Sequence, residues 1–147
     1  FAITNYPNSG LSNTQNVRII REFKDVFVAN DEYKELRGKT ISLKDLKRFP
    51  ILMLDRKSTT SEFLHSMFQR HQLDLVPEIE LSSNDLLIDL ARIGLGVAFV
   101  PDYCIPDNER SLFKVQIEEE LPTRQIVVAS NDSLPISQAA KQFMEML

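Results

Sequence analysis

The sequence alternates between short, wholly apolar stretches and longer stretches in which apolar residues recur every three or four positions. Residues 51–54 and 97–100 contain no polar side chain, which is typical of strands covered on both faces by other elements. Between them, apolar residues fall at helical spacing after a run of hydroxyl side chains that begins at Ser58. These apolar residues are Phe63, Leu64, Met67 and Phe68. The alternation of strand and helix patterns predicts an α/β fold with a largely parallel sheet.

Further segments extend this pattern toward the N-terminus. Residues 1–4 are predicted to be the end of a buried strand, and the Asn-, Pro- and Gly-containing segment 5–10 to be a turn. Residues 17–29 predict either two strands or one long bent strand. A short helix is expected after Ser42, which is available as its N-cap, and residues 77–81 alternate like a strand.

The segment after residue 81 carries signals for both ends of a helix. Ser82 or Ser83 can cap its first turn. Gly94 or Gly96 can end it, because glycine adopts the left-handed conformation at little cost. The apolar face predicted for this helix consists of Leu86, Leu87, Leu90 and Ile93.

The last part of the chain predicts one more strand and one more helix. The strand is expected at residues 125–129 and the helix at about 135–147, with Ser133 as a plausible N-cap. The sequence of 147 residues contains no internal repeat and is long enough for one sizeable domain.

The composition limits the functions open to this segment. Its formal net charge is −4, which argues against direct nucleic-acid binding, because phosphate contacts require concentrated Lys and Arg. The most basic stretch, residues 34–48, is interrupted by Glu35 and Asp45 and is interpreted as a solvated surface. No apolar run approaches the roughly 20 residues that cross a bilayer, so no membrane partner is expected.

The chemically reactive residues form no catalytic or metal-binding motif. The single cysteine, Cys104, cannot form an internal disulfide, and a reducing, cytoplasmic setting is the simplest inference. His65 and His71 are six positions apart on one predicted helix and therefore fall on different faces. No Ser-His-Asp or Cys-His arrangement and no acid pair can be recognised from spacing. We therefore expect no enzymatic activity, no metal and no cofactor.

Three stretches together carry a resemblance to a known family. They are ISLKDL followed by FPIL in residues 41–52, LARIGLGVAFVP in residues 90–101, and PISQAA in residues 135–140, leading into Phe143. In this order and at these spacings they resemble the effector-binding domain of LysR-type transcriptional regulators over nearly the whole chain. The run from Gly94 to Pro101 is the most specific. It is not a dinucleotide fingerprint, because its glycines end a helix instead of opening one. The family often has His-Pro where this chain has EYKEL in residues 32–36, a peripheral departure.

The resemblance implies a type 2 periplasmic-binding-protein-like fold with two Rossmann-like subdomains. Residues 26–115 would form subdomain II, and residues 1–25 with 116–147 would form an incomplete subdomain I. That part should bury less surface and be less stable unless the missing residues are supplied. Members of the family normally also carry a winged helix-turn-helix DNA-binding domain, which we expect to precede Phe1 in the full-length protein.

In such folds the ligand lies between the subdomains, where strand ends and helix N-termini converge. A helix N-terminus carries partial positive charge and suits a carboxylate or another small anion. The effector-binding residues implied by the resemblance are Thr4, Asn5, Ser82, Ser83, Asn84, Phe99 and Pro101.

Each candidate also has a purely structural alternative. One of the two serines, Ser82 or Ser83, can simply be an N-cap, which leaves the other hydroxyl free. Thr4 and Asn5 can be turn-forming residues, and Phe99 can belong to the core. Residues 56–60 (RKSTT) offer a second helix N-terminus with positive charge, for which plain capping is favoured.

The predicted function is effector sensing in a cytoplasmic LysR-type regulator. A small metabolite, with an anion as one candidate, would bind in the cleft and change the arrangement of a homodimer or tetramer. DNA would be contacted only through the missing N-terminal domain. The alternative is a solute-binding module of a transporter, which shares this fold but needs a secretion signal or lipid anchor. A small enzyme on an α/β scaffold is a third hypothesis, which only the fold class supports.

Overall fold

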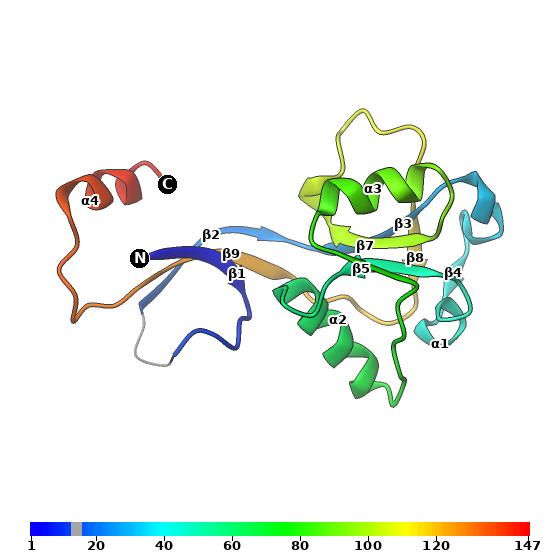
Figure 1. The fold of residues 1–147 in the computed structure, drawn as a ribbon, viewed down its shortest axis with the longest axis horizontal. Coiled ribbons are helices and arrows are strands. Elements are labelled where there is room, and N and C mark those ends of the chain that lie inside the picture. Colours follow the sequence, from blue (N-terminus) through cyan, green and yellow to red (C-terminus); the bar gives the residue numbers. More distant parts are fainter. Residues whose placement is uncertain (13–15) are drawn as a thin grey trace. The chain divides into compact units, whose positions relative to one another are not determined.

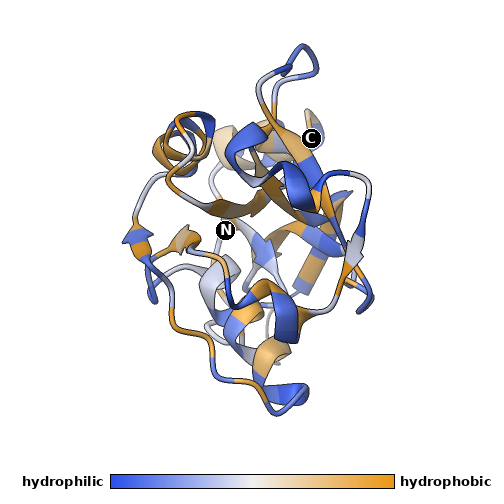
Figure 2. Cartoon of the chain, turned by 90° about the vertical axis from the view of Figure 1, so that its right-hand side faces the viewer, coloured by the Kyte–Doolittle hydropathy of each residue, from blue (hydrophilic) through white to orange (hydrophobic). Residues whose placement is uncertain are grey.

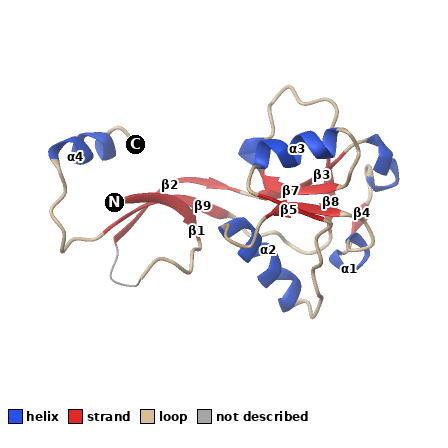
Figure 3. Ribbon diagram, viewed as in Figure 1, coloured by secondary structure: helices blue, strands red, loops and turns tan. Residues whose placement is uncertain are grey.

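The computed structural model describes residues 1–12 and 16–147, which form two compact units. One unit contains residues 1–23 and 123–147, and the other contains residues 24–122. Figure 1 labels the helices and strands, and Figure 3 distinguishes them by colour.

The larger unit is built on a six-stranded sheet in the order β4-β8-β3-β7-β5-β6. Its strands are β3 (Asp25–Ala29), β4 (Thr40–Ile41), β5 (Ile51–Leu54), β6 (Ile79–Leu81), β7 (Val97–Pro101) and β8 (Phe113–Ile117). β7, β5 and β6 run parallel to one another, and β4 runs parallel to β8. β3 is antiparallel to both of its neighbours, β7 and β8. Five of the six described strands of this sheet therefore run in one direction, as expected for a largely parallel sheet, and β3 runs in the other. The direction of β3 was not predicted, because strand direction depends on distant partners that local periodicity does not report.

The three central strands of this sheet direct alternate side chains into two separate cores. In β5, Ile51 and Met53 belong to one core, whereas Leu52 and Leu54 belong to the other. The first core lies under helices α1 (Leu43–Leu46) and α2 (Thr59–Arg70), and the second lies under α3 (Asn84–Arg92). Figure 1 shows α3 and α2 on opposite sides of the strands, and Figure 2 colours the hydrophobic stretches orange. The wholly apolar strand pattern thus corresponds to burial on both faces.

The start signals predicted for the helices of this unit are confirmed. Ser42, Ser58 and Ser83 are the N-caps of α1, α2 and α3, and each side-chain oxygen accepts a backbone N–H of the first turn. The predicted stripe of α2 is buried or packed against the core. Two short 3₁₀ helices, Asp31–Leu36 and Asp102–Cys104, and strands β4 and β8 were not anticipated from periodicity.

The buried face of α3 differs from the predicted one. Leu87, Ile88 and Ala91 are its buried residues, whereas Leu86 is 46% and Ile93 is 68% exposed. Apolar residues cover more than half of the circumference of this helix, opposite Asp85, Asp89 and Arg92, so spacing alone does not select which part of the apolar side meets the sheet. Contacts with Ala98 and Val100 of β7 in the second core select it instead.

The smaller unit contains a three-stranded antiparallel sheet and one helix. Its strands are β1 (Ala2–Tyr6), β2 (Asn16–Phe23) and β9 (Arg124–Ser130), in the order β1-β9-β2, and its helix is α4 (Gln138–Glu145). Residues 17–29 therefore form two strands, β2 and β3. The central strand β9 buries Val127, Val128 and Ala129. β1 is an edge strand in which Ile3 is 45% exposed, so the expectation of a buried strand at residues 1–4 is wrong.

Helix α4 begins later than predicted. Ser137 is its N-cap, whereas Ser133 donates to the side chain of Asn131 in a turn. The Asn131 side chain accepts the backbone N–H of Ser133. This local hydrogen bond favours a turn over a helix at this point. No residue of α4 is buried. Within residues 1–12 and 16–147, no helix is both long and apolar enough to span a bilayer.

Replacement of Gly94 by alanine is expected to destabilise the larger unit. Gly94 has φ +81°, and an added Cβ would lie 2.6 Å from Cγ of Glu32. Gly38 also has a positive φ, +70°, but open space around it, so Gly38→Ala is the matched control. The left-handed backbone costs about 1–2 kcal/mol for a non-glycine residue in both variants. Urea unfolding should show that Gly94→Ala loses more stability than Gly38→Ala, and equal losses would contradict the predicted steric contribution.

Amide hydrogen exchange is expected to separate the two units. Strands β3, β5 and β7 lie between the two cores, so their backbone amides are covered on both faces of the sheet. In contrast, α4 and β1 bury no side chain. Sparse burial lowers the free energy of local opening. Exchange followed by NMR should therefore be fastest in β1 and α4 and slowest in the central strands of the six-stranded sheet. Comparable protection of α4 and β5 would contradict this.

Candidate functional site

The parallel strands of the larger unit bring three chain segments to one edge of the sheet. β7, β5 and β6 are parallel, so their carboxyl ends lie together, followed by Asp102, Asp55 and Ser82 respectively. Helices α2 and α3 both begin at this carboxyl edge. Each helix N-terminus presents N–H groups without intrahelical partners and a partial positive charge. The edge therefore combines two features that suit a polar or anionic ligand.

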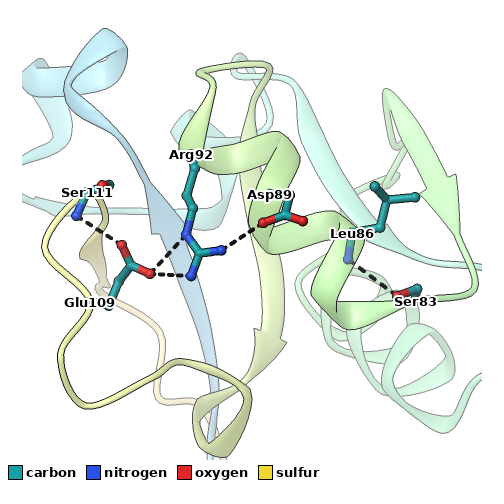
Figure 4. Close-up of polar contacts among 6 residues, drawn as sticks. All are labelled: Ser83, Leu86, Asp89, Arg92, Glu109 and Ser111. Atoms are coloured by element: carbon teal, nitrogen blue, oxygen red, sulfur yellow. Dashed lines mark hydrogen bonds and ion pairs between the residues drawn. The ribbon is translucent and has the colours of Figure 1, made fainter.

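The two serines at the start of α3 have different roles. Oγ of Ser83 accepts a hydrogen bond from the Leu86 backbone N–H at 3.3 Å (Figure 4). Ser82 is exposed, and its hydroxyl makes no hydrogen bond to any residue that the structure describes. The capping role expected for one serine is thus taken by Ser83. The Ser82 hydroxyl is available to a ligand.

Two buried oxygens in the first turns of these helices are without hydrogen-bond partners in the described part of the chain. They are Oδ1 of Asn84 in α3 and Oγ of Ser61 in α2. A buried acceptor without a donor costs about 1–3 kcal/mol, so a bound donor group that reached either atom would gain free energy. Ser61 was not among the predicted residues. Its only sequence signal is the hydroxyl run Ser-Thr-Thr-Ser at residues 58–61.

Positive charge lies at the α2 end of the carboxyl edge. Arg56 and Lys57 precede the N-cap of α2, and Nε of Arg56 lies 3.9 Å from Oε1 of Glu80. Burial, together with the positive charge of Arg56, lowers the pKa of His65 on the same helix. His65 is therefore neutral at neutral pH and adds no charge there.

Negative charge lies at the α3 end of the same edge. Burial, followed by the carboxylates of Asp85, Asp102 and Asp25, raises the pKa of Cys104 to about 11. The thiol is therefore protonated at neutral pH. It lacks the thiolate character that a nucleophile or metal ligand requires.

An ion-pair network fixes the far end of α3. Glu109 accepts hydrogen bonds from Nε of Arg92 at 3.0 Å and from Nη2 at 2.5 Å, while Asp89 accepts from Nη1 at 2.7 Å (Figure 4). The Arg92 hydrogen bonds lower the pKa of Glu109. Asn30 donates to the Arg92 carbonyl at 3.0 Å, and the Tyr33 hydroxyl donates to the Gly94 carbonyl at 3.2 Å. These contacts position α3, and with it the serines at its N-terminus.

The other predicted site residues occupy different surroundings. Thr4 and Asn5 are half-buried in the smaller unit, and Thr4 Oγ1 accepts a hydrogen bond from the Asn8 amide at 2.8 Å. β1 continues through Tyr6, so these residues do not end the strand. Their contact with an effector stays a prediction.

Phe99 and Pro101 belong to the interior of the larger unit. Phe99 is fully buried, and its ring centroid lies 4.7 Å from that of Phe27 in the first core. Pro101 is also buried, at the end of β7. Phe99 therefore offers no surface to a ligand in this structure, and the alternative that it is a core residue accounts for its position. In the described ranges 1–12 and 16–147, no cluster of three His, Cys, Asp or Glu side chains could hold a metal ion.

Comparison with known proteins defines the family. The family model described as the LysR substrate binding domain matches residues 1–147, and the chain belongs to this family. The chain is 26% identical over 140 residues to the HTH-type transcriptional regulator BsdA of Bacillus subtilis (strain 168), a match that covers 92% of this chain and 48% of that protein. The chain thus spans about half the length of this relative.

Solved structures establish the fold. The regulatory domain of CcmR from Synechocystis PCC6803, in complex with 2-PG, matches with a TM-score of 0.83 at 22% identity, covering 98% of this chain and 69% of that one. The effector-binding domain of QuiR, in complex with shikimate, matches with a TM-score of 0.82 at 16% identity, covering 99% and 69%. The chain therefore has the type 2 periplasmic-binding-protein-like fold of LysR regulatory domains, as the sequence predicted. The family is one of transcriptional regulators, which are generally not enzymes.

Replacement of Glu109 by glutamine is expected to loosen α3 in a pH-dependent manner. Because the folded pKa of Glu109 is lowered, its ionised form stabilises the fold above the unfolded value of about 4.3. This contribution is lost as the pH falls through the folded pKa. Loss of the charged hydrogen bonds should cost about 1–2 kcal/mol at neutral pH, and the difference from the unsubstituted chain should shrink in acid.

The matched control is Asp89→Asn. It removes the charge of the other carboxylate that pairs with Arg92, which is more exposed than that of Glu109. An exposed pair contributes only about 0–1 kcal/mol. Urea unfolding at several pH values measures both variants. An effect of Glu109→Gln that persists unchanged below the folded pKa would show that the carboxylate charge is not the cause.

Proposed function

We propose that this chain is the effector-sensing part of a cytoplasmic LysR-type transcriptional regulator. The observation that carries the proposal is the family match over all 147 residues. The fold similarity to two regulatory domains that bind small molecules, 2-PG in CcmR and shikimate in QuiR, adds support. In the proposed mechanism a small metabolite favours one arrangement of a homodimer or tetramer. DNA-binding domains outside this segment then change their position on the promoter.

The two compact units are proposed to correspond to the two subdomains of the family. Residues 24–122 would be subdomain II, and residues 1–23 with 123–147 would be part of subdomain I. These limits differ by a few residues from those expected from the sequence, because β8 packs entirely within the larger unit. The sparse burial in the smaller unit supports the idea that further chain completes it.

The effector is proposed to bind at the carboxyl edge of β7, β5 and β6, with Ser82, Ser83 and Asn84 among its contacts. Ser82 supplies a free hydroxyl, and Asn84 supplies a buried acceptor without a donor among the described residues. Arg56 and Lys57 favour an anionic group at the α2 end. A small molecule with an acidic group at one end and hydroxyl or amine donors at the other matches this charge distribution.

A solute-binding module of a transporter is the less supported function. Such modules share the fold, so fold similarity alone does not separate the two. The sequence family separates them, because both the family match and the curated relative belong to transcriptional regulators.

Ser82→Ala in the intact regulator is expected to weaken the effector response without weakening effector-free promoter binding. Ser82 makes no hydrogen bond to the described residues, so its loss should remove only a ligand contact. Small organic acids, with shikimate and 2-PG as the first probes, can be screened by thermal shift. For the acid that binds, Ser82→Ala should lower its affinity roughly tenfold, the effect of losing about 1.4 kcal/mol of contact energy. Equal loss of promoter binding with and without effector would contradict the assignment of Ser82 to the effector site.

Two capping serines provide the controls. Ser83→Ala should weaken the response and also lower stability by about 1 kcal/mol, because Ser83 caps α3. Ser42→Ala removes an equivalent cap from α1, which follows β4, the strand at the opposite end of the sheet from β6. It should lower stability similarly and leave the effector response unchanged. A response lost equally in Ser42→Ala would mean that stability, and not contact, explains the effect.

A further inference from the structure

Three ionisable side chains of the larger unit lie together beside helix α2. They are Arg56, which follows β5, Glu80 in β6, and His65 on α2 itself. Nε of Arg56 lies 3.9 Å from Oε1 of Glu80. The charges of both residues act on the His65 imidazole, with opposite effects on its pKa. The proposed effector site uses only Arg56 of these three, so Glu80 and His65 have no role in it yet.

The sheet directs Glu80 toward α2. Ile79 and Leu81 pack against the second core, under α3, so Glu80 between them points to the opposite face of the sheet. The residue paired with Glu80 on β5 is Met53, which belongs to the first core, under α2. Glu80 therefore lies on the face that carries His65. The four residues of β5 are all apolar and add no charge there.

His65 has hydrogen-bonding capacity that the described part of the fold leaves unused. Its Nε2 atom is buried and has no hydrogen-bond partner within residues 1–12 and 16–147. A protonated Nε2 is a donor, for which a carboxylate is the natural acceptor. Glu80 is the carboxylate whose charge acts on His65. The remaining charged residues of α2 and the adjoining segments are Asp55, Lys57, Glu62, Arg70 and Glu78.

In the ligand-free structure the charges of Arg56 and Glu80 oppose each other at His65. Burial, and then the positive charge of Arg56, lower the pKa of His65, whereas the Glu80 carboxylate raises it. Because Arg56 lies beside Glu80, it also offsets the carboxylate charge felt by the imidazole. An anion bound to Arg56 would neutralise the guanidinium and leave the Glu80 carboxylate free to face His65. Both changes favour protonation of His65.

We propose that Glu80 exchanges partners when an anion binds at the α2 end of the carboxyl edge: it pairs with Arg56 in the empty site and with the His65 imidazolium in the occupied site. This inference rests on the proposed function, because it takes the acidic group of the effector as the ligand of Arg56. Ser61 supports a ligand at this end. It is fully buried in the first turn of α2, and its Oγ has no hydrogen-bond partner among the described residues.

The exchange couples effector binding to uptake of one proton, which passes from solvent to Nε2 of His65. A ligand that favours the protonated form binds more tightly where that form is populated. Anion affinity therefore rises as the pH falls through the pKa of His65 in the occupied site. It levels off below the pKa of His65 in the empty site. The proposed effector site thus becomes sensitive to pH without a titrating group among its direct contacts.

The titration of His65 without ligand tests the exchange. NMR signals of the imidazole measure its pKa in the unsubstituted chain, in Arg56→Gln, in Glu80→Gln and in the double variant. Arg56→Gln should raise the pKa of His65, and Glu80→Gln should lower it. The rise caused by Arg56→Gln should be smaller when Glu80 is also replaced, because no carboxylate is then released. An equal rise with and without Glu80 would show that Arg56 acts only through its own charge, and would overturn the exchange.

Arg48→Gln is the matched control for the loss of an arginine. It removes an exposed guanidinium that lies 3.7 Å from Asp45 on α1, which follows the strand at the other end of the sheet. This variant should leave the titration of His65 unchanged. A rise as large as that in Arg56→Gln would mean that the net charge of the chain, and not the local pair, sets the protonation of His65.

Sulfate is the anion probe, because it keeps its charge throughout the titration of a histidine. Saturable shifts of the first-turn amides of α2 report binding. Sulfate should raise the pKa of His65 in the unsubstituted chain but not in Arg56→Gln. It should bind up to about fivefold more tightly at about pH 5 than at about pH 8, the limit for an exposed ion pair. Absence of these shifts, or an equal pH dependence in His65→Gln, would contradict the proposed coupling.

These results are distinguishable from a failure of the proposed function. If Ser82→Ala leaves the effector response intact while the Arg56 and Glu80 variants behave as expected, the effector site is misplaced and the exchange stands. If Ser82→Ala weakens the response while Glu80 has no influence on the Arg56 effect, the proposed function stands and the exchange is wrong.

Discussion

Burial of the central strands on both faces is the constraint on which the larger unit depends. β3, β5 and β7 have apolar side chains on both sides, so helices must cover each face to remove them from water. Helices α1 and α2 cover one core and α3 covers the other. The parallel course of β7, β5 and β6 then brings the N-termini of α2 and α3 to a single edge. The candidate site follows from this packing, because each helix begins directly after a strand that ends at this edge.

Helix α3 is held at both ends by different kinds of contact. Near its C-terminus, Arg92 binds Glu109, and the left-handed Gly94 turns the chain toward β7 within reach of Tyr33. At its N-terminus, the Ser83 hydroxyl accepts a hydrogen bond from the Leu86 N–H, which has no partner within the helix. The strong contacts are therefore concentrated at the end away from the candidate site. Ser82 and Asn84 retain polar capacity that the described part of the fold does not use, which is the arrangement expected of a site supported by a rigid element.

The features that were predictable from sequence are those with a local physical cause. Serine N-caps, the glycine that ends α3 and the wholly apolar strands all depend on residues within one turn or one strand. The features that were missed depend on distant partners. The direction of β3, the exposed side of α3 at Leu86 and Ile93, and the open edge strand β1 are each set by segments far along the chain. The sequence prediction placed the start of α4 too early for a local reason, because the Asn131 side chain accepts the N–H of Ser133 in a turn. Ser61 was missed because only burial distinguishes its hydroxyl from the three that precede it.

The smaller unit buries far fewer apolar side chains than the larger unit, and this limits its stability. Only β9, among the described strands of this unit, contributes a continuous buried run. Helix α4 is attached through the Arg18 bond to Met144 and through stacking of Phe1 on Phe143, with ring centroids 5.9 Å apart. Anything that binds only the folded state stabilises it by mass action. Whatever covers α4 and β1 would therefore raise the stability of the smaller unit, because neither element buries a side chain by itself. Binding at the carboxyl edge of the larger unit would instead act on a helix already fixed by Arg92 and Glu109.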